Sequence, residues 1–293
     1  MSRLFTFGCS YTSYAWPTWA ELYSVQHDQF YNYGCIGVGN KAIFERLMQA
    51  ISKHNISKDD VVVVQWTHHT RFDWYLNSDR LNRGIGWQTR GSMFIDENKR
   101  IFDSRFLNIF FDEESYYMHT LNFMQAAALA LDSVGCSWKF TSITDISKTT
   151  SKNNLFEKTT ILKYANSKRV DTTTDDLWNI YPNLKHYEQS VFMKFSDHWL
   201  PPIKDWITEH VNEITHYKFL NIGPTLIDYH PTAEQYSKYI FANLEMSNDT
   251  KLKILEYVEK LNKIIITDVL QDRLVVVKQL EQSFPHLAAP EIQ

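Results

Sequence analysis

The sequence predicts an α/β fold in which a central parallel sheet is covered by helices on both faces, giving three layers. Short apolar segments alternate along the chain with segments whose apolar residues recur every three or four positions. Residues 61–64 are four consecutive valines, which is typical of a central parallel strand buried on both faces. Glycine-bearing turns follow the first two apolar segments. In such a sheet, functional groups are expected at the carboxyl ends of the strands.

The first half of the chain yields three strands and two helices in order. Residues 4–7 form an apolar strand that ends in a glycine, and Pro17 suits the first position of the helix that follows. Residues 30–33 form a second strand, and a turn containing three glycines leads from it into a helix, in which apolar residues recur every three or four positions from Ile43 to Ile51. The valine run extends to Gln65 and forms the third strand.

The pattern loosens at residues 71–114, where aromatic and charged residues follow no period, so we expect a loop or excursion over the sheet there. A helix returns over 114–134, with Gly135 placed to end it. Residues 138–143 form the next strand. The stretch 144–217 begins polar and then becomes rich in aromatic residues, which indicates an insertion that covers the substrate.

The C-terminal part divides at about residue 247. Thr232 and Gln235 match a capping box, which predicts a helix over 233–244. Residues 247–293 carry two amphipathic helical patterns. We therefore expect a domain over 1–246 and a helical extension over 247–293. The extension either docks on the domain or pairs with a second subunit in a homo-oligomer.

Composition excludes several classes of protein. The chain has 293 residues, of which 44% are hydrophobic, enough to bury a sizeable core. The net charge is −4 and no basic block is present, so a nucleic-acid partner is not expected. No segment is apolar enough to cross a membrane, and the N-terminus lacks the pattern of a signal peptide, which predicts a cytoplasmic protein. The cysteines (Cys9, Cys35 and Cys136) show no metal-binding spacing.

Three residues have the layout of a serine hydrolase. Ser10 follows the first strand, at the expected start of a helix, and Asp228 and His230 lie together far downstream. Ser10 would be the nucleophile, His230 the general base and Asp228 the residue that orients the imidazole. Ser13 is a weaker nucleophile because it lies past the turn. The alternative is that Ser10 only starts a turn and that the Asp228–His230 segment forms an N-terminal helix cap with an exposed histidine.

These residues resemble the SGNH (GDSL-type) hydrolases. Gly8-Cys9-Ser10 corresponds to the family's Gly-Asp-Ser, with cysteine at the aspartate position. Asn32 to Gly37 is similar to the second block, and Asp228-Tyr229-His230 to the last, one residue shorter than usual. The resemblance implies a flavodoxin-like fold and ester hydrolysis without a metal or cofactor. It also implies an oxyanion hole formed by the N–H groups of Ser10 and Gly37, although Gly37 equally suits a tight structural turn.

The third family block departs from the pattern. The family has Gly-x-Asn after the third strand, whereas residues 65–69 contain no asparagine. Thr67 or His68 would substitute as the third oxyanion donor; otherwise the hole has two donors. Adjacent histidines at a strand end point in opposite directions, so His68 and His69 predict no metal site. Arg71 is a candidate to bind a substrate carboxylate, or else pairs with a surface acid. Trp66 is a candidate to stack on a sugar ring, or else packs in the interior.

The expected substrate is a small-molecule or glycan ester, and the aromatic segments favour O-acetyl groups on a glycan. A second interpretation is an SGNH fold that has lost activity and serves as a binding or structural module, for example in a virion. A third is an acyltransferase that uses the same triad. The chain's content of Asn, Lys and Tyr resembles that of hydrolase-like bacteriophage proteins, in which case the protein is virion-associated.

Overall fold

The computed structural model describes residues 2–77, 86–92, 105, 113–146, 191–220, 226–267 and 269–283. Its centre is a sheet of parallel strands in the order β2-β1-β3-β6. The strands are β1 (Arg3–Gly8), β2 (Gln29–Gly34), β3 (Asp60–Trp66) and β6 (Ser137–Ser142). The valine run lies in β3, between β1 and β6, as expected for a strand buried on both faces.

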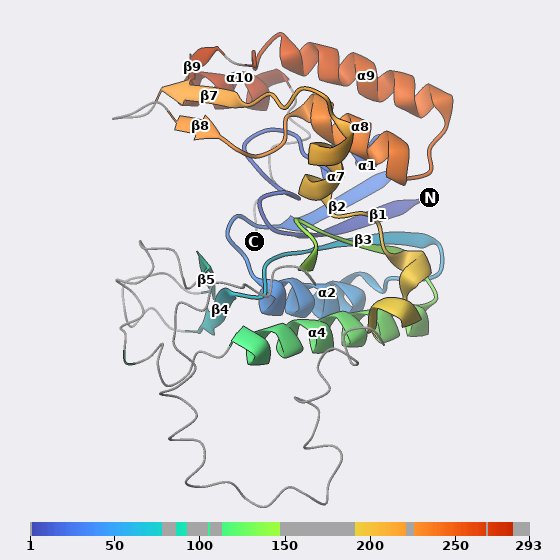
Figure 1. The fold of residues 1–293 in the computed structure, drawn as a ribbon. Coiled ribbons are helices and arrows are strands. Elements are labelled where there is room, and N and C mark those ends of the chain that lie inside the picture. The colour runs from blue at the N-terminus through green and yellow to red at the C-terminus, as the bar shows by residue number, and fades with distance from the viewer. Residues whose placement is uncertain are drawn as a thin grey trace, which may run out of the picture.

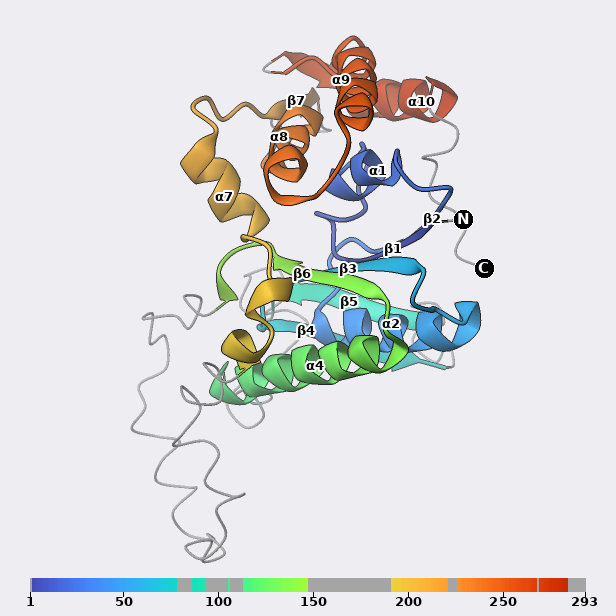
Figure 2. The ribbon, with the colours of Figure 1, turned by 90° about the vertical axis from the view of Figure 1, so that its right-hand side faces the viewer.

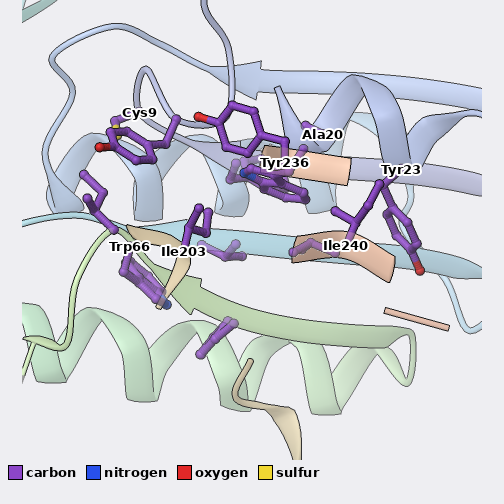
Figure 3. Close-up of a cluster of buried hydrophobic side chains, with 14 of the residues drawn as sticks. Cys9, Ala20, Tyr23, Trp66, Ile203, Tyr236 and Ile240 are labelled. Atoms are coloured by element: carbon purple, nitrogen blue, oxygen red, sulfur yellow. The ribbon is translucent and has the colours of Figure 1, made fainter. Parts of the chain in front are cut away.

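Helices cover both faces of this sheet (Figures 1 and 2), which confirms the predicted three-layer α/β/α fold class. One face carries α2 (Asn40–His54) and α4 (Glu113–Val134), which pack against each other. The other face carries α1 (Trp19–Ser24) and α8 (Ala233–Asn243). Figure 3 shows side chains of α1 and α8 meeting in the core, among them Ala20, Tyr23, Tyr236 and Ile240.

Helix α1 begins at Trp19, later than the sequence pattern predicts. Thr18 is its N-cap, with extended backbone angles, and it forms a capping box with Glu21. Pro17 therefore precedes the cap instead of occupying the first helical position. Trp16, the first residue of the aromatic stripe, lies in the loop before the helix, and its side chain is buried there.

The aperiodic region after β3 contains a hairpin that the sequence did not reveal. Strands β4 (Arg71–Leu76) and β5 (Gly86–Ser92) pair in antiparallel fashion. The alternation of apolar and polar residues is disrupted because Asp73 is buried while Tyr75 is 55% exposed. The helix predicted next is α4, and Gly135, with φ +75°, ends it as expected.

The predicted insertion is described only at its ends, since residues 147–190 lie outside the described residues. Its C-terminal part contains a short 3₁₀ turn, η5 (Ser196–His198), and helix α7 (Ile203–His210). The chain returns beside β6, where Leu200 N–H donates to Phe140 O at 2.8 Å. Whether the insertion covers a substrate stays a prediction.

A second sheet, with strand order β8-β7-β9, follows the insertion (Figure 1). It comprises β7 (Tyr217–Leu220), β8 (Leu226–Asp228) and β9 (Leu270–Asp272). Strands of three or four residues are too short to show a period, so the sequence did not predict them. Capping by Thr232 and Gln235 starts α8 as predicted.

The two C-terminal helices are present as α9 (Asn248–Asn262) and α10 (Arg273–Ser283). Helix α9 packs on α8, and β9 between the two helices extends the second sheet by pairing with β7. The described part of the extension is thus docked on its own chain, while pairing with a second subunit stays a prediction. Among the helices that the structure describes, none is long and apolar enough to cross a membrane.

Candidate active site

The turn after β1 presents Ser10 at the carboxyl end of the central sheet. Cys9 O accepts hydrogen bonds from the N–H groups of Thr12 (2.9 Å) and Ser13 (3.1 Å), which closes a tight turn around Ser10. Gln65, fully buried on β3, accepts from Cys9 N–H at 3.2 Å and from the Thr12 hydroxyl at 3.1 Å. The turn is therefore held both by its own backbone hydrogen bonds and by the Gln65 side chain of the neighbouring strand.

Ser10 does not lie at a helix N-terminus, contrary to the sequence interpretation. The residues after it form this turn, and the helix begins only at Trp19. Stabilisation of negative charge by the α1 dipole is thus not available at Ser10, because that effect falls off within the first turn.

The elements that place Asp228 and His230 come from the C-terminal half of the chain and contact the loop that follows Ser10. Asp228 ends β8 and pairs in register with Tyr217 of β7. The Trp16 indole N–H donates to Pro231 O at 3.3 Å, which ties the segment after His230 to the loop after Ser10. Thr232, rather than Asp228 or His230, caps α8.

The three side chains lie in one hydrogen-bonded line. His230 Nε2 lies 2.8 Å from Ser10 Oγ, and His230 Nδ1 lies 2.7 Å from Asp228 Oδ1. An ionised carboxylate only accepts hydrogen bonds, so Nδ1 carries the proton and Nε2 is free to accept from the serine hydroxyl. Burial raises the pKa of Asp228, but its hydrogen bonds from His230 and Tyr14 outweigh burial and lower the pKa. The arrangement is suited to proton transfer from Ser10 to His230.

Two tyrosines of the nucleophile loop surround His230, and sequence reasoning missed both. Tyr14 stacks on the imidazole with ring centroids 3.9 Å apart, and its hydroxyl donates to Asp228 Oδ2 at 2.6 Å. Tyr11 also contacts the imidazole, in a tilted arrangement with ring centroids 5.1 Å apart. Neither residue belongs to a motif, so only the folded chain reveals their position.

The loop that carries Gly37 is held by the hairpin strand β4. Asp73 accepts the Gly39 N–H at 2.8 Å and the Ala42 N–H at 3.2 Å, so it caps α2 from a neighbouring element. Arg71 donates to Val38 O at 2.9 Å. Gly37 itself has φ +77°, a backbone conformation that favours glycine.

Arg71 therefore has a structural contact that the sequence did not anticipate. Its guanidinium holds the carbonyl next to Gly37 and is half-buried. Binding of a substrate carboxylate by the remaining N–H groups stays a prediction.

The proposed third donors differ in accessibility. Thr67 is 1% exposed, and its backbone N–H and carbonyl are both bound to the Asn40 side chain, at 2.8 and 3.0 Å. A hydroxyl at that depth does not reach a substrate, which contradicts its role as donor. His68 is half-buried, and burial, followed by the charge of Arg71, lowers its pKa to about 4. Its ring is neutral at pH 7 and carries one N–H, so His68 stays the candidate third donor.

Trp66 lies in the core (Figure 3) and packs edge-on against Phe140, with ring centroids 5.3 Å apart. Because the side chain is fully buried, the prediction that it stacks on a substrate is wrong, and the alternative of interior packing holds. Within the described ranges, no group of three or more His, Cys, Asp or Glu residues is placed to hold a metal ion.

Comparisons with known proteins identify no close relative. No protein-family model matches the chain, and no curated protein matches its sequence. Among solved structures, the chain is similar to a member of the lipolytic protein G-D-S-L family from Veillonella parvula DSM 2008. The TM-score is 0.37 and the identity 11%, over 87% of this chain and 97% of that one. A likeness at this level carries no functional conclusion, so the candidate site stands on its own geometry.

Proposed function

We propose that this protein is a serine ester hydrolase. The observation that carries the proposal is the 2.8 Å contact between Ser10 Oγ and His230 Nε2, across 220 residues of sequence. Contact between the hydroxyl of a tight turn and an imidazole bound to a buried carboxylate is the requirement for an activated serine.

The reaction follows from these positions. Ser10 Oγ attacks the ester carbonyl carbon while His230 Nε2 takes the hydroxyl proton, and Asp228 stabilises the resulting imidazolium. The tetrahedral intermediate collapses as His230 returns the proton to the leaving alkoxide, which yields an acyl-serine and an alcohol. Water then attacks the acyl-serine with His230 as base, and release of the carboxylic acid restores Ser10.

The oxyanion is expected to be bound by backbone donors. No acceptor among the described residues is hydrogen-bonded to the N–H groups of Ser10 or Gly37, so both are free to donate to substrate. Removal of one such donor typically costs roughly 10² to 10³ in turnover. If His68 does not donate, the hole has two donors, and a modest hydrolase is expected.

Labelling and turnover test the proposal. Purified protein should hydrolyse p-nitrophenyl acetate and be labelled at Ser10 by a fluorophosphonate. Ser10→Ala should lower kcat by at least about 10³-fold and abolish labelling. Ser13→Ala, in the same loop but outside the hydrogen-bonded line, is the matched control and should retain both. A folded wild-type protein that is neither active nor labelled would favour a binding or structural module.

For the substrate, we propose an O-acetylated glycan. The hairpin β4–β5 is tied to the Gly37 loop through Asp73, and it presents Tyr75, which is 55% exposed, against a half-buried Trp87. Aromatic faces of this kind are suited to stacking on a sugar ring. Trp87→Ala should raise KM for acetylated xylan several-fold while kcat/KM for p-nitrophenyl acetate stays unchanged. An equal loss on both substrates would contradict the proposal.

A further inference from the structure

We propose that Tyr14 is a positioning residue of this site, which fixes the Asp228 carboxylate and the His230 ring together. The inference deepens the proposed hydrolase function and rests on it. Tyr14 follows Ser10 by four residues and reaches the two other members of the line from the nucleophile's own loop.

The first contact is with the carboxylate. The two Asp228 oxygens have separate partners: Oδ1 accepts from the ring and backbone of His230, at 2.7 and 3.0 Å, while Oδ2 accepts from the Tyr14 hydroxyl at 2.6 Å. Asp228 is 5% exposed, so water does not readily replace a lost donor. The tyrosine hydroxyl thus satisfies the oxygen that the histidine leaves open and prevents rotation of the carboxylate.

The second contact is with the imidazole. The Tyr14 ring lies nearly parallel to His230, with an interplanar angle of 23° and a centroid distance of 3.9 Å. An aromatic face at this distance restricts the tilt of the ring. It also favours the positive charge that His230 acquires when it accepts the serine proton. One side chain therefore orients the base and stabilises its charged form.

A charged residue of the C-terminal extension lies over the Tyr14 ring. The Arg273 guanidinium carbon, at the start of α10, lies 6.0 Å from the centroid of the Tyr14 ring. Burial and the hydrogen bond to Asp228 raise the pKa of Tyr14, whereas the charge of Arg273 acts to lower it. The net effect is a raised pKa, so the hydroxyl stays protonated and donates throughout the neutral range.

The groups that face the Asp228–His230 pair come from several elements. They are Tyr14, Tyr11 and Ser10 from the nucleophile loop, Arg273 from α10, and Tyr236 from α8. Burial raises the pKa of Tyr11 to about 12, and burial also raises the pKa of Tyr236 well above its ordinary value. The tyrosines therefore do not titrate near neutral pH, and a change in the pH dependence of a Tyr14 variant reports on the pair itself.

Tyr14→Phe separates the hydroxyl from the ring because stacking on His230 is retained. Loss of the donor raises the pKa of Asp228 and increases its attraction for a protonated His230. The acidic limb of the pH–rate profile should move up by about one pH unit, because a hydrogen bond to a charged group has roughly that effect. At pH 7, kcat should fall about 10-fold with KM unchanged. The matched control is Tyr31→Phe, which removes a hydroxyl bonded to Gln29 on a stacked ring remote from the site.

A second measurement on Tyr14→Phe needs no substrate. NMR follows the ¹³C signal of the Asp228 carboxyl and the ring signals of His230 as the pH is varied. Both titrations should move to higher pH in Tyr14→Phe and stay in place in Tyr31→Phe. Unmoved titrations and an unmoved acidic limb would overturn the proposal, even if activity or melting temperature fell. Because these titrations need no substrate, they test the role of Tyr14 even if the wild-type protein hydrolyses no ester.

Arg273→Met gives a second variant that leaves the tyrosine in place. Removal of the guanidinium makes the Tyr14 hydroxyl a weaker donor, so the titrations should move in the same direction by less than half as much. A shift in the opposite direction would contradict the proposed coupling between α10 and Asp228.

Discussion

Gly8 is the residue on which the position of Ser10 most directly depends. A Cβ at this site would lie 2.1 Å from Thr12 Oγ1 and 2.7 Å from Gln65 Oε1, the two groups that fix the turn. Gly8→Ala therefore forces the nucleophile turn to move. We expect kcat for p-nitrophenyl acetate to fall roughly 100-fold, since a displacement of about 1 Å has that effect. Overpacking should also lower the free energy of unfolding by about 1–3 kcal/mol.

Gly135→Ala is the control for this prediction. Gly135 has φ +75°, and no atom lies within 4 Å of the position that a Cβ would take, so alanine costs about 1 kcal/mol of backbone strain without displacing a neighbour. It ends α4, far along the chain from the nucleophile turn, and should leave kcat unchanged. A Gly8→Ala protein with wild-type kcat would show that the turn tolerates displacement.

At the level of single residues, the sequence predicted the groups that a motif marks and missed those that support them. Each of Ser10, Asp228 and His230 lies in a short block with a chemical pattern, which is why the sequence predicted that they lie together, and hydrogen bonds join them in the structure. Tyr14, Gln65 and Arg273 carry no pattern. Their roles depend on elements brought together from distant parts of the chain, and no local spacing encodes such contacts.

At the level of elements, Asp73 connects the hairpin to the Gly37 loop. Asp73→Ala removes the acceptor for the N–H groups of Gly39 and Ala42 and should cost about 1 kcal/mol as a lost helix cap. Because the Gly37 loop then loses an anchor, kcat should also fall at least about 10-fold. Thermal melts and steady-state kinetics measure the two effects separately.

Ser247→Ala is the matched control. Ser247 caps α9 by accepting from Thr250 N–H at 3.1 Å, and it is exposed. It should cost a similar free energy of unfolding with no loss of kcat. Equal kinetic losses in the two variants would mean that Asp73 acts only through global stability.

Elements with a clear apolar pattern were predicted from the sequence, whereas very short elements and those with a disrupted pattern were missed. Helices α2, α4 and α8 and the four parallel strands follow from apolar spacing and caps, with ends within a few residues. The hairpin β4–β5 was missed because the buried carboxylate of Asp73 replaces an apolar residue in its pattern. Strands β7, β8 and β9 were missed because their pairing, not their composition, defines them.

At the level of the whole molecule, the described part of the extension (247–267 and 269–283) packs against the rest of the chain, so we expect the two to unfold together. Ile254 of α9 is fully buried, β9 completes the sheet that carries Asp228, and Arg273 reaches the Tyr14 ring. Ile254→Ala should therefore cost about 2–5 kcal/mol. In a chain of this size that lowers the melting temperature by roughly 3 to 8 °C. Near-UV circular dichroism and loss of ester hydrolysis should report the same shifted transition.

Leu252→Ala, on the same helix but 59% exposed, is the control and should change the free energy of unfolding by less than about 0.5 kcal/mol. Two separate transitions in Ile254→Ala, with activity surviving the first, would instead assign the extension to an independent domain.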